Sequence, residues 1–229
     1  MTLPPEVSAV LPADTARTWE TISPAIPASA YLAGGTALAV NLRHRESRDL
    51  DFFFDDPALD LDVLDLRLRS LGPFAVTSRA PDTLNGLFSH TRVQFLRAQG
   101  QINLEEPMLV AGIRVLGLPD ILAMKVKAIG DRGELRDYFD LERIEQMTGR
   151  TFEEGLGLYM SRYDVKPEDT SIMRIVTALG YLDDVDEDDL LPESKQEIAQ
   201  YWTRRQPQVI RSLSRFGAGP VRQVKKVVK

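Results

Sequence analysis

Residues 31–54 read YLAGGTALAVNLRHRESRDLDFFF, and this stretch decides the fold. Its first three residues are apolar and predict a short strand, which Gly34 and Gly35 end. Residues 36–43 carry apolar side chains at helical spacing, and residues 49–54 alternate before they become aromatic, as a half-buried strand does. The stretch therefore predicts a strand, a glycine turn, a helix and a second strand.

The turn Gly34-Gly35-Thr36 is a candidate nucleotide-binding site. Glycines let the backbone approach a ligand closely. The N-terminus of the following helix offers free N–H groups and a partial positive charge, which suit a phosphate. Taken alone, the turn has a simpler alternative, which is a tight connection that binds nothing.

Asp49 and Asp51 are candidate metal ligands on the second strand. Side chains at i and i+2 of a strand share one face, where two carboxylates repel each other. Magnesium ligation resolves that repulsion. The phenylalanines 52–54 follow directly, so we expect the strand to enter the core with the aspartate pair at its mouth. The alternative is a solvent-facing sheet edge.

A third candidate group follows, with Lys125, Arg132 and the Arg136-Asp137-Tyr138-Phe139-Asp140 string. Lys125 lies in an apolar helical stretch, where a lysine is unexpected unless it points into a site. Lys125, Arg132 and Arg136 share a face if the helix continues or resumes across Gly133. The alternative is an Arg136–Asp140 ion pair beside a lysine that reaches solvent along its own stem.

The remaining pattern predicts an α+β protein with an α/β part over residues 1–118 and a helical part over 119–229. We expect an irregular lead over 1–13 and strands at 74–78, 84–89, 91–97 and 113–115. We expect helices at 15–22 with Asp14 as N-cap, 59–71, 121–129, 134–147, 151–160, from just after 167–169 through 179, and 193–215 with Pro207 as a kink.

Composition narrows the class of protein. The chain of 229 residues is 43% hydrophobic and 27% charged, which is ordinary for a globular protein. It has no cysteine and only two histidines, which excludes disulfides, thiol catalysis and a multi-histidine zinc site. A bound metal should therefore be hard and oxygen-ligated, such as Mg²⁺. No apolar run is long enough for a membrane span and the N-terminus lacks a secretion signal, so we expect a cytoplasmic protein.

Charge is unevenly distributed. The net charge is −6, but residues 203–229 carry eight Lys or Arg and no Asp or Glu, which leaves −14 on the rest of the chain. A second basic cluster covers residues 43–48, and residues 183–189 hold six carboxylates. The simple interpretation is solvated surface. The alternative is a basic surface that grips a polyanion while an acidic core holds metal.

Together the three motifs resemble a polymerase-β-type nucleotidyltransferase. The string Ala33-Gly34-Gly35-Thr36-Ala37-Leu38-Ala39, the string His44-Arg45-x-Ser47-x-Asp49-Leu50-Asp51 and the string Ala123-Met124-Lys125 followed by Arg132-Gly133 and Arg136-Asp137 resemble the AbiEii/AbiGii toxin family, which includes the MenT toxins. The resemblance covers residues 31–141. It implies a nucleotidyltransferase-type mixed sheet with flanking helices.

The resemblance also implies roles for residues. Gly34, Gly35 and Thr36 would match the phosphate-binding turn, Asp49 and Asp51 the Mg²⁺ ligands, and Lys125 the lysine on the triphosphate, with Arg132 and Arg136 beside it. Asp137 would match a late essential aspartate, which Arg136 and Asp140 flank. Many polymerase-β-type enzymes have a third carboxylate on a later strand. Only Gln94 is available here, so Asp137 is the candidate base. Ser47 matches a serine that an antitoxin kinase phosphorylates in some members.

The implied function is that of a toxin in a toxin–antitoxin system, which adds nucleotides from an NTP to a tRNA 3′ end and so blocks aminoacylation. A cognate antitoxin is the implied partner. The candidate tRNA contacts are the basic residues Arg43, Arg45, Arg211, Arg215, Lys225 and Lys226. Two alternatives stay open: a nucleotidyltransferase acting on a small molecule or protein, and a non-catalytic NTP-binding module.

Overall fold

The computed structural model describes residues 2–216 and contains one seven-stranded mixed sheet with strand order β3-β4-β5-β2-β1-β7-β6. β2 runs parallel to β5 and antiparallel to β1, and β1 runs parallel to β7. The strands are β1 (Ala30–Ala33), β2 (Leu50–Phe54), β3 (Phe74–Ala80), β4 (Thr83–Phe88), β5 (Thr91–Arg97), β6 (Met108–Val110) and β7 (Ile113–Val115).

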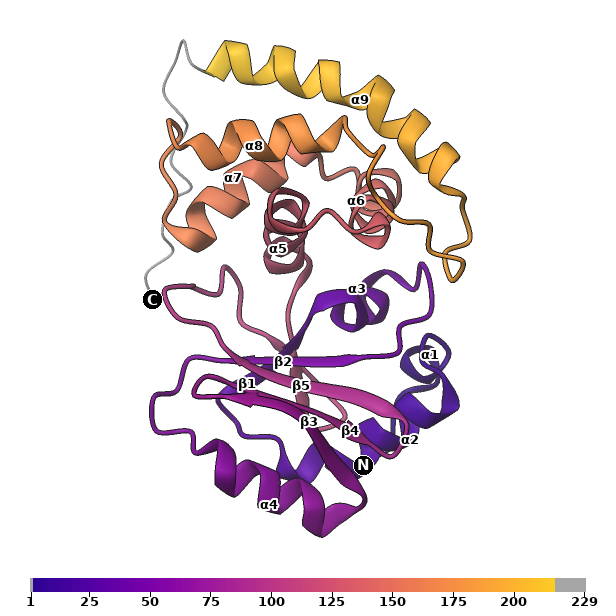
Figure 1. Ribbon diagram of the computed structural model, residues 1–229, viewed down its shortest axis with the longest axis vertical. Coiled ribbons are helices and arrows are strands. Elements are labelled where there is room, and N and C mark those ends of the chain that lie inside the picture. Colours follow the sequence, from indigo (N-terminus) through magenta and orange to yellow (C-terminus); the bar gives the residue numbers. More distant parts are fainter. Residues whose placement is uncertain (1, 217–229) are drawn as a thin grey trace.

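Helices cover both faces of the sheet (Figure 1). α2 and α4 pack against one face and α3 packs against the other, beyond which α5 to α9 form a separate stack. The predicted α+β class is confirmed. The helices are α1 (Pro5–Ser8), α2 (Ala13–Ile22), α3 (Gly34–Leu42), α4 (Leu61–Leu71), α5 (Leu118–Asp131), α6 (Leu135–Thr148), α7 (Phe152–Tyr163), α8 (Thr170–Leu179) and α9 (Lys195–Phe216).

β2 lies at the centre of the sheet, between β5 and β1, and the burial of its side chains alternates. Leu50, Phe52 and Phe54 are fully buried, and the Phe52 ring stacks on Phe95 of β5 at 5.0 Å between centroids. Asp51 and Phe53 point to the opposite face and are partly exposed. A central strand has no solvent-facing edge, so that alternative for the aspartate pair is wrong.

Local signals fix several helix starts. The carboxylates of Asp60 and Asp169 and the Thr151 hydroxyl accept N–H groups in the first turns of α4, α8 and α7. α9 runs through Pro207 and is anchored by Trp202, whose buried indole N–H donates to the carbonyl of Tyr138.

One continuous apolar core joins the sheet to the helical stack. The division of the chain into two domains at residue 118 stays a prediction. Within residues 2–216, no helix is both long and apolar enough to cross a membrane.

Three details of the prediction are wrong. The lead is not irregular, because it contains α1 and buries apolar side chains of Leu3, Val7, Val10 and Leu11. Asp14 lies inside the first turn of α2, where Pro12 is the N-cap. β6 was not expected, because its three residues are largely exposed and pair only with β7.

Candidate active site

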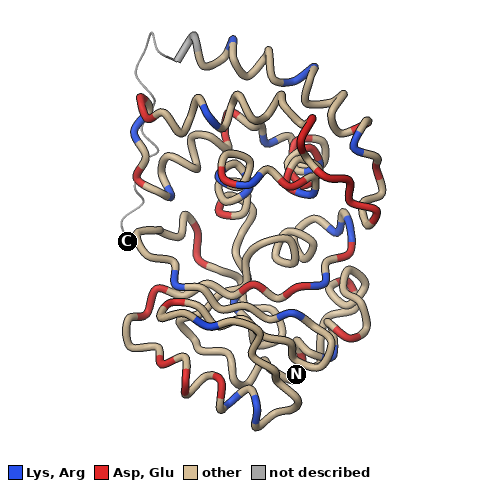
Figure 2. Tube along the Cα trace, viewed as in Figure 1, with Lys and Arg blue, Asp and Glu red and all other residues tan. Residues whose placement is uncertain are grey.

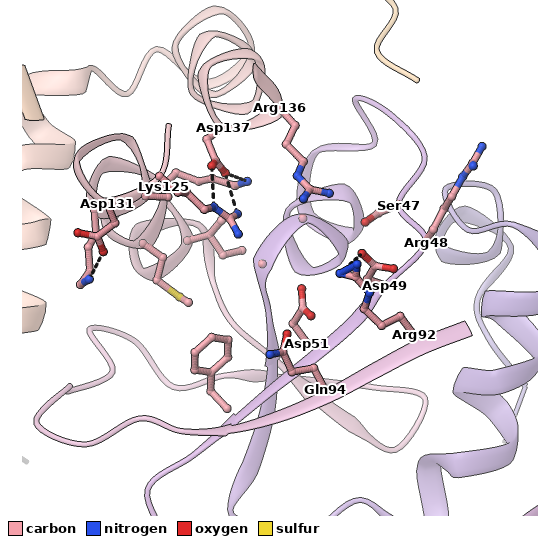
Figure 3. Close-up of a pocket in the computed structure, with 18 of the residues that line it drawn as sticks. Ser47, Arg48, Asp49, Asp51, Arg92, Gln94, Lys125, Asp131, Arg136 and Asp137 are labelled. Carbon is pink, nitrogen blue, oxygen red and sulfur yellow. Dashed lines mark hydrogen bonds and ion pairs between the residues drawn. The ribbon is translucent and has the colours of Figure 1, made fainter. Parts of the chain in front are cut away.

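A cavity of about 630 Å³ lies between the sheet and the helical stack, and it gathers most of the predicted site residues (Figure 3). Its walls come from the start of α3, the 45–49 segment, β2, β5, α5, α6 and α7, with residues 188–191 closing one side. The predicted residues that line it are Gly34, Gly35, Arg45, Ser47, Asp49, Asp51, Lys125, Arg132, Arg136 and Asp137.

The glycine turn brings the start of α3 against the carboxylate of Asp51. Ala33 pairs with Asp51 across β1 and β2, and Gly34 turns the chain with a φ of +66°. A Cβ at Gly34 would stand 2.8 Å from Asp51 Oδ2, so both the conformation and the space require glycine. The N-cap Ala33 has no side chain that can cap the helix, which leaves the first N–H groups of α3 available for an anion.

Thr36 lies behind this turn rather than in the cavity. Its buried hydroxyl is hydrogen-bonded to the Ser47 hydroxyl at 2.7 Å and also donates to the backbone carbonyl of Asp49. Across the turn, a Cβ at Gly35 would lie 2.9 Å from Arg45 Nη2 and 3.3 Å from Ser47 Oγ. Thr36 therefore fixes the backbone that carries Ser47 and Asp49, while Ser47 itself faces the glycine turn at Gly35.

Asp49 and Asp51 are suited to a hard cation. Within the described residues, the carboxylate of Asp51 makes no hydrogen bond or ion pair, and burial together with the charge of Asp49 raises its pKa. Asp49 has one distant partner, Arg92, at 3.8 Å. The described residues contain no cluster of three or more metal-binding side chains. Two carboxylates fit Mg²⁺, which takes one or two of them and completes its shell with water and substrate phosphates.

Gln94, the residue expected in place of a third carboxylate, lies beside Asp51 on the neighbouring strand. It pairs directly with Asp51 across the parallel β2 and β5 strands, and both side chains reach the cavity (Figure 3). Gln94 is uncharged, so it adds an amide oxygen and no further repulsion beside Asp51.

Lys125 faces the aspartates from the opposite wall. Its Nζ lies 2.8 Å from Asp137 Oδ1 and 2.6 Å from Asp140 Oδ2, and the residue is only 5% exposed. Burial alone would lower the pKa of Lys125, but the two carboxylates outweigh burial and raise it. The ammonium has three donors, so one remains for a ligand. The alternative of a lysine that reaches solvent is wrong.

Arg132 and Arg136 stand beside Lys125, as predicted from their spacing. α5 ends at Asp131, Gly133 turns with a φ of +58°, and α6 resumes, which leaves all three cations on the cavity wall. Arg132 donates to both oxygens of Asp137, at 3.1 and 3.3 Å. Arg136 pairs with Glu134, so the alternative interpretation, an Arg136–Asp140 ion pair, is wrong.

Asp140 instead joins the 43–48 segment to α6. Its Oδ1 lies 2.8 Å from His44 Nε2 and 2.8 Å from Arg45 Nε, and Arg45 Nη2 donates to Oδ2 at 2.9 Å. Burial would raise the pKa of Asp140, but Lys125, His44 and Arg45 hold it well below 3.8. Nothing in the sequence indicated these contacts, because about a hundred residues separate the partners.

Asp137 is arranged to position cations rather than to take a proton. Burial would raise its pKa, but Lys125 and Arg132 outweigh burial and lower it. A general base works best with a pKa near the working pH. The geometry therefore favours Asp137 as the group that orients Lys125 and Arg132.

Within the described residues, the basic segments separate into paired and exposed cations. Arg45 is bound to Asp140, whereas Arg43 and Arg48 are exposed. In the tail, Arg205 pairs with Glu145 and Glu153, and Arg211 is exposed. The Arg215 side chain and the residues Lys225 and Lys226 lie outside the described part.

The acidic residues 183–189 form the loop between α8 and α9 (Figure 2). Lys195 holds this loop by donating to the carbonyls of Asp183 and Val185. Asp188 and the following Leu190 and Leu191 reach the cavity wall. The loop therefore closes one side of the site and is not merely solvated surface.

A glycine turn, two strand aspartates and a facing lysine–arginine cluster on this fold are the arrangement expected of a nucleotidyltransferase. The sequence matches the family "Nucleotidyl transferase AbiEii toxin, Type IV TA system" over residues 24–102 and 96–218, and the chain belongs to this family of toxin–antitoxin nucleotidyltransferases.

Further comparisons give one relative in sequence and two solved structures of similar fold. An uncharacterized protein of Aquifex aeolicus (strain VF5) is 33% identical over 175 residues, which cover 75% of this chain and 80% of that protein. JHP933 of Helicobacter pylori is similar in fold, with a TM-score of 0.52 and 18% sequence identity. The match covers 94% of this chain and 97% of the JHP933 chain. The nucleotidyltransferase toxin MenT4 of Mycobacterium tuberculosis H37Rv is also similar in fold, with a TM-score of 0.53 and 16% sequence identity. The match covers 88% of this chain and 84% of the MenT4 chain. Both likenesses concern the fold alone.

Proposed function

We propose that this toxin transfers nucleotides from an NTP to the 3′ end of tRNA in a Mg²⁺-dependent reaction, which blocks aminoacylation and so acts in the cytoplasm. The observation that carries the proposal is the cavity itself, in which Asp49 and Asp51 face Lys125 and Arg132 across one space. Nucleotidyl transfer builds negative charge on the phosphates, and this arrangement offers cations where that charge develops.

The residues divide the work by charge. Mg²⁺ on Asp49 and Asp51 would neutralise phosphate oxygens and activate the attacking hydroxyl. The free donor of Lys125 and the half-exposed guanidinium of Arg132 bind the triphosphate and stabilise the pyrophosphate as it leaves. The first N–H groups of α3 at Gly34 and Gly35 hold a further phosphate oxygen.

The decisive experiment incubates the protein with each labelled NTP, Mg²⁺ and total tRNA, and in parallel with aminoglycosides and with bulk protein. We expect label on tRNA with at least one NTP, and none when EDTA is added. Label on a small molecule or protein would replace the tRNA proposal. NTP binding without any transfer would indicate a binding module that acts through a partner.

Exposed cations outside the cavity are proposed to hold the tRNA phosphates. Changing Arg43 and Arg211 to Glu should raise the KM for tRNA. Fewer phosphate contacts would form, so fewer counterions would be released when tRNA binds. It should also flatten the slope of log affinity against log salt by about one per contact. The dissociation constant for NTP should stay unchanged. Transfer kinetics from 50 to 200 mM salt check this.

The matched control reverses the same charge on the far face of the sheet. Among the described residues, Arg17 on α2 and Arg69 on α4 pair with neighbours on their own helices, and Arg17→Glu with Arg69→Glu changes the net charge by the same amount. Equal effects of the two double variants would show that only net charge matters, and would contradict a tRNA surface at Arg43 and Arg211.

A charge at Ser47 should inactivate the toxin, which fits regulation by an antitoxin kinase. The Ser47 hydroxyl lies beside Gly35 and Arg45, so an added phosphate would compete for the groups that face the triphosphate. We expect Ser47→Asp to weaken NTP binding roughly tenfold or more. The control in titration calorimetry is Ser47→Asn, because asparagine has the shape of aspartate without its charge. Equal affinities of the two variants would contradict the electrostatic explanation.

A further inference from the structure

We propose that His44 is a positioning residue, which acts through Asp140 on Lys125 and so controls how strongly the cavity binds the triphosphate. By donating to Asp140, His44 limits how tightly that carboxylate holds Lys125. The ammonium of Lys125 then stays available to the phosphates. The proposal rests on the proposed binding of NTP in the cavity and adds a residue that is not among those lining it.

The side chain of His44 is fully buried between α3 and α6. α3 ends at Leu42, and Arg43 adopts a left-handed conformation with a φ of +56°. Residues other than glycine rarely adopt this conformation, because it crowds the Cβ atom. The turn leads the chain to α6, where the His44 ring stacks on Phe139 at 6.0 Å between centroids.

Only one nitrogen of the His44 ring is hydrogen-bonded among residues 2–216. Nε2 lies 2.8 Å from Asp140 Oδ1, whereas Nδ1 is buried without a partner. A charged imidazolium would carry a second N–H at Nδ1 and would leave it buried without an acceptor, which is costly. The neutral tautomer, in which Nε2–H donates to the carboxylate, is the one that fits these contacts. His44 therefore contributes a hydrogen bond and no charge.

Asp140 is surrounded by four donors. Nε2 of His44 and Nε of Arg45 approach Oδ1, each at 2.8 Å. Arg45 Nη2 and Lys125 Nζ approach Oδ2, at 2.9 and 2.6 Å. A carboxylate has about four acceptor sites, so all of them are used. The donors share one negative charge, and Lys125 receives only part of it.

The cluster around Lys125 has more cations than carboxylates. Three cations share two carboxylates, which leaves a net charge of +1. All three cations line the cavity, so this excess positive charge faces a bound triphosphate. The cations are Lys125, Arg45 and Arg132, and the carboxylates are those of Asp137 and Asp140.

Loss of the His44 donor should change this balance at Lys125. Asp140 is fully buried, and a buried carboxylate that loses one hydrogen bond interacts more strongly with the donors that remain. Lys125 Nζ would then be held more firmly, and its remaining donor would turn less readily to a phosphate. Asp140 has to place Lys125 without neutralising it, and His44 sets that balance.

The test compares two His44 variants that each lose a different part of the imidazole. His44→Gln keeps an N–H donor close to the position of Nε2 and loses the ring that stacks on Phe139. His44→Phe keeps a ring and loses the donor. We expect the dissociation constant for NTP in Mg²⁺ to rise roughly 5- to 20-fold for His44→Phe and to stay within about twofold of the wild type for His44→Gln. The melting temperature should fall for both, since each loses a buried contact.

His90→Phe is the matched control, because His90 is the other histidine of the chain and is exposed between β4 and β5, outside the cavity. Its affinity for NTP should equal that of the wild type. His44→Phe is also combined with Asp140→Asn, at a temperature at which the single and double variants are folded. Because His44 acts through Asp140, it should weaken NTP binding no further in that background. If Asp140→Asn does not fold, the comparison of His44→Gln with His44→Phe decides alone.

Titration calorimetry with each NTP and no acceptor separates this proposal from the proposed function, because it needs no transfer. If His44→Phe weakens NTP binding and His44→Gln does not, the positioning role stands even when no tRNA is labelled. Equal losses of affinity in the two variants would show that His44 only stabilises the fold, and would overturn the proposal. A full effect of His44→Phe in the Asp140→Asn background would overturn it too, since His44 would then act by another route.

Discussion

Asp51→Asn should abolish nucleotide transfer, by about 10³-fold or more, while the melting temperature holds or rises. The two results have one cause. The Asp51 carboxylate is largely removed from water, makes no hydrogen bond or ion pair within the described residues, and has its pKa raised by burial and by Asp49. A charge in that position destabilises the metal-free fold. A neutral side chain of the same shape therefore stabilises the metal-free protein and at the same time removes the proposed metal ligand.

Asp55→Asn is the matched control, because Asp55 follows β2 directly and is exposed outside the cavity. Single-turnover transfer and thermal unfolding would be measured for both variants without metal. Transfer at the wild-type rate by Asp51→Asn would remove Asp51 from the active site. A lower melting temperature for that variant would show that the carboxylate stabilises the fold and is not held for a ligand.

Asp140→Asn should have the largest effect on stability, with a loss of about 3–5 kcal/mol and a fall in Tm of roughly 6–20 °C. The carboxylate is fully buried and is shared by His44, Arg45 and Lys125. Removing one member of a buried ionic cluster leaves the others desolvated without their counter-charge. NTP binding should fall as well, because Lys125 and Arg45 both line the cavity.

The pH dependence of unfolding checks the cause. The pKa of Asp140 is held well below 3.8 in the folded protein, so its ion pairs contribute stability above about pH 4, and that contribution is lost as the pH falls toward the folded pKa. The gap between wild type and Asp140→Asn should therefore narrow on acidification. Glu154→Gln, which breaks the exposed Arg150 pair, should cost about 0.5 kcal/mol or less. A gap that does not change with pH would contradict the electrostatic cause.

Short sequence patterns predicted those site residues whose positions depend on the backbone within a few residues of them. The glycine turn and the alternating Asp49-x-Asp51 strand follow from residues a few positions apart, and a lysine in an apolar helix marked Lys125. The partners of Asp140 could not be predicted, because they depend on how α3 and α6 meet. The placement of residues 102–105 beside the sheet could not be predicted either, because it depends on the buried Asp120–Arg162 ion pair between α5 and α7.

The cavity draws its walls from Gly34 to Leu191, and this span has a consequence during synthesis. At the usual rate of translation, about ten seconds or more separate the emergence of the two aspartates from that of the residues that close the site. A growing chain on the ribosome therefore carries carboxylates without the cations that face them. If tRNA is the acceptor, as proposed, the growing chain does not modify the tRNAs that serve that same ribosome, because its site is still incomplete.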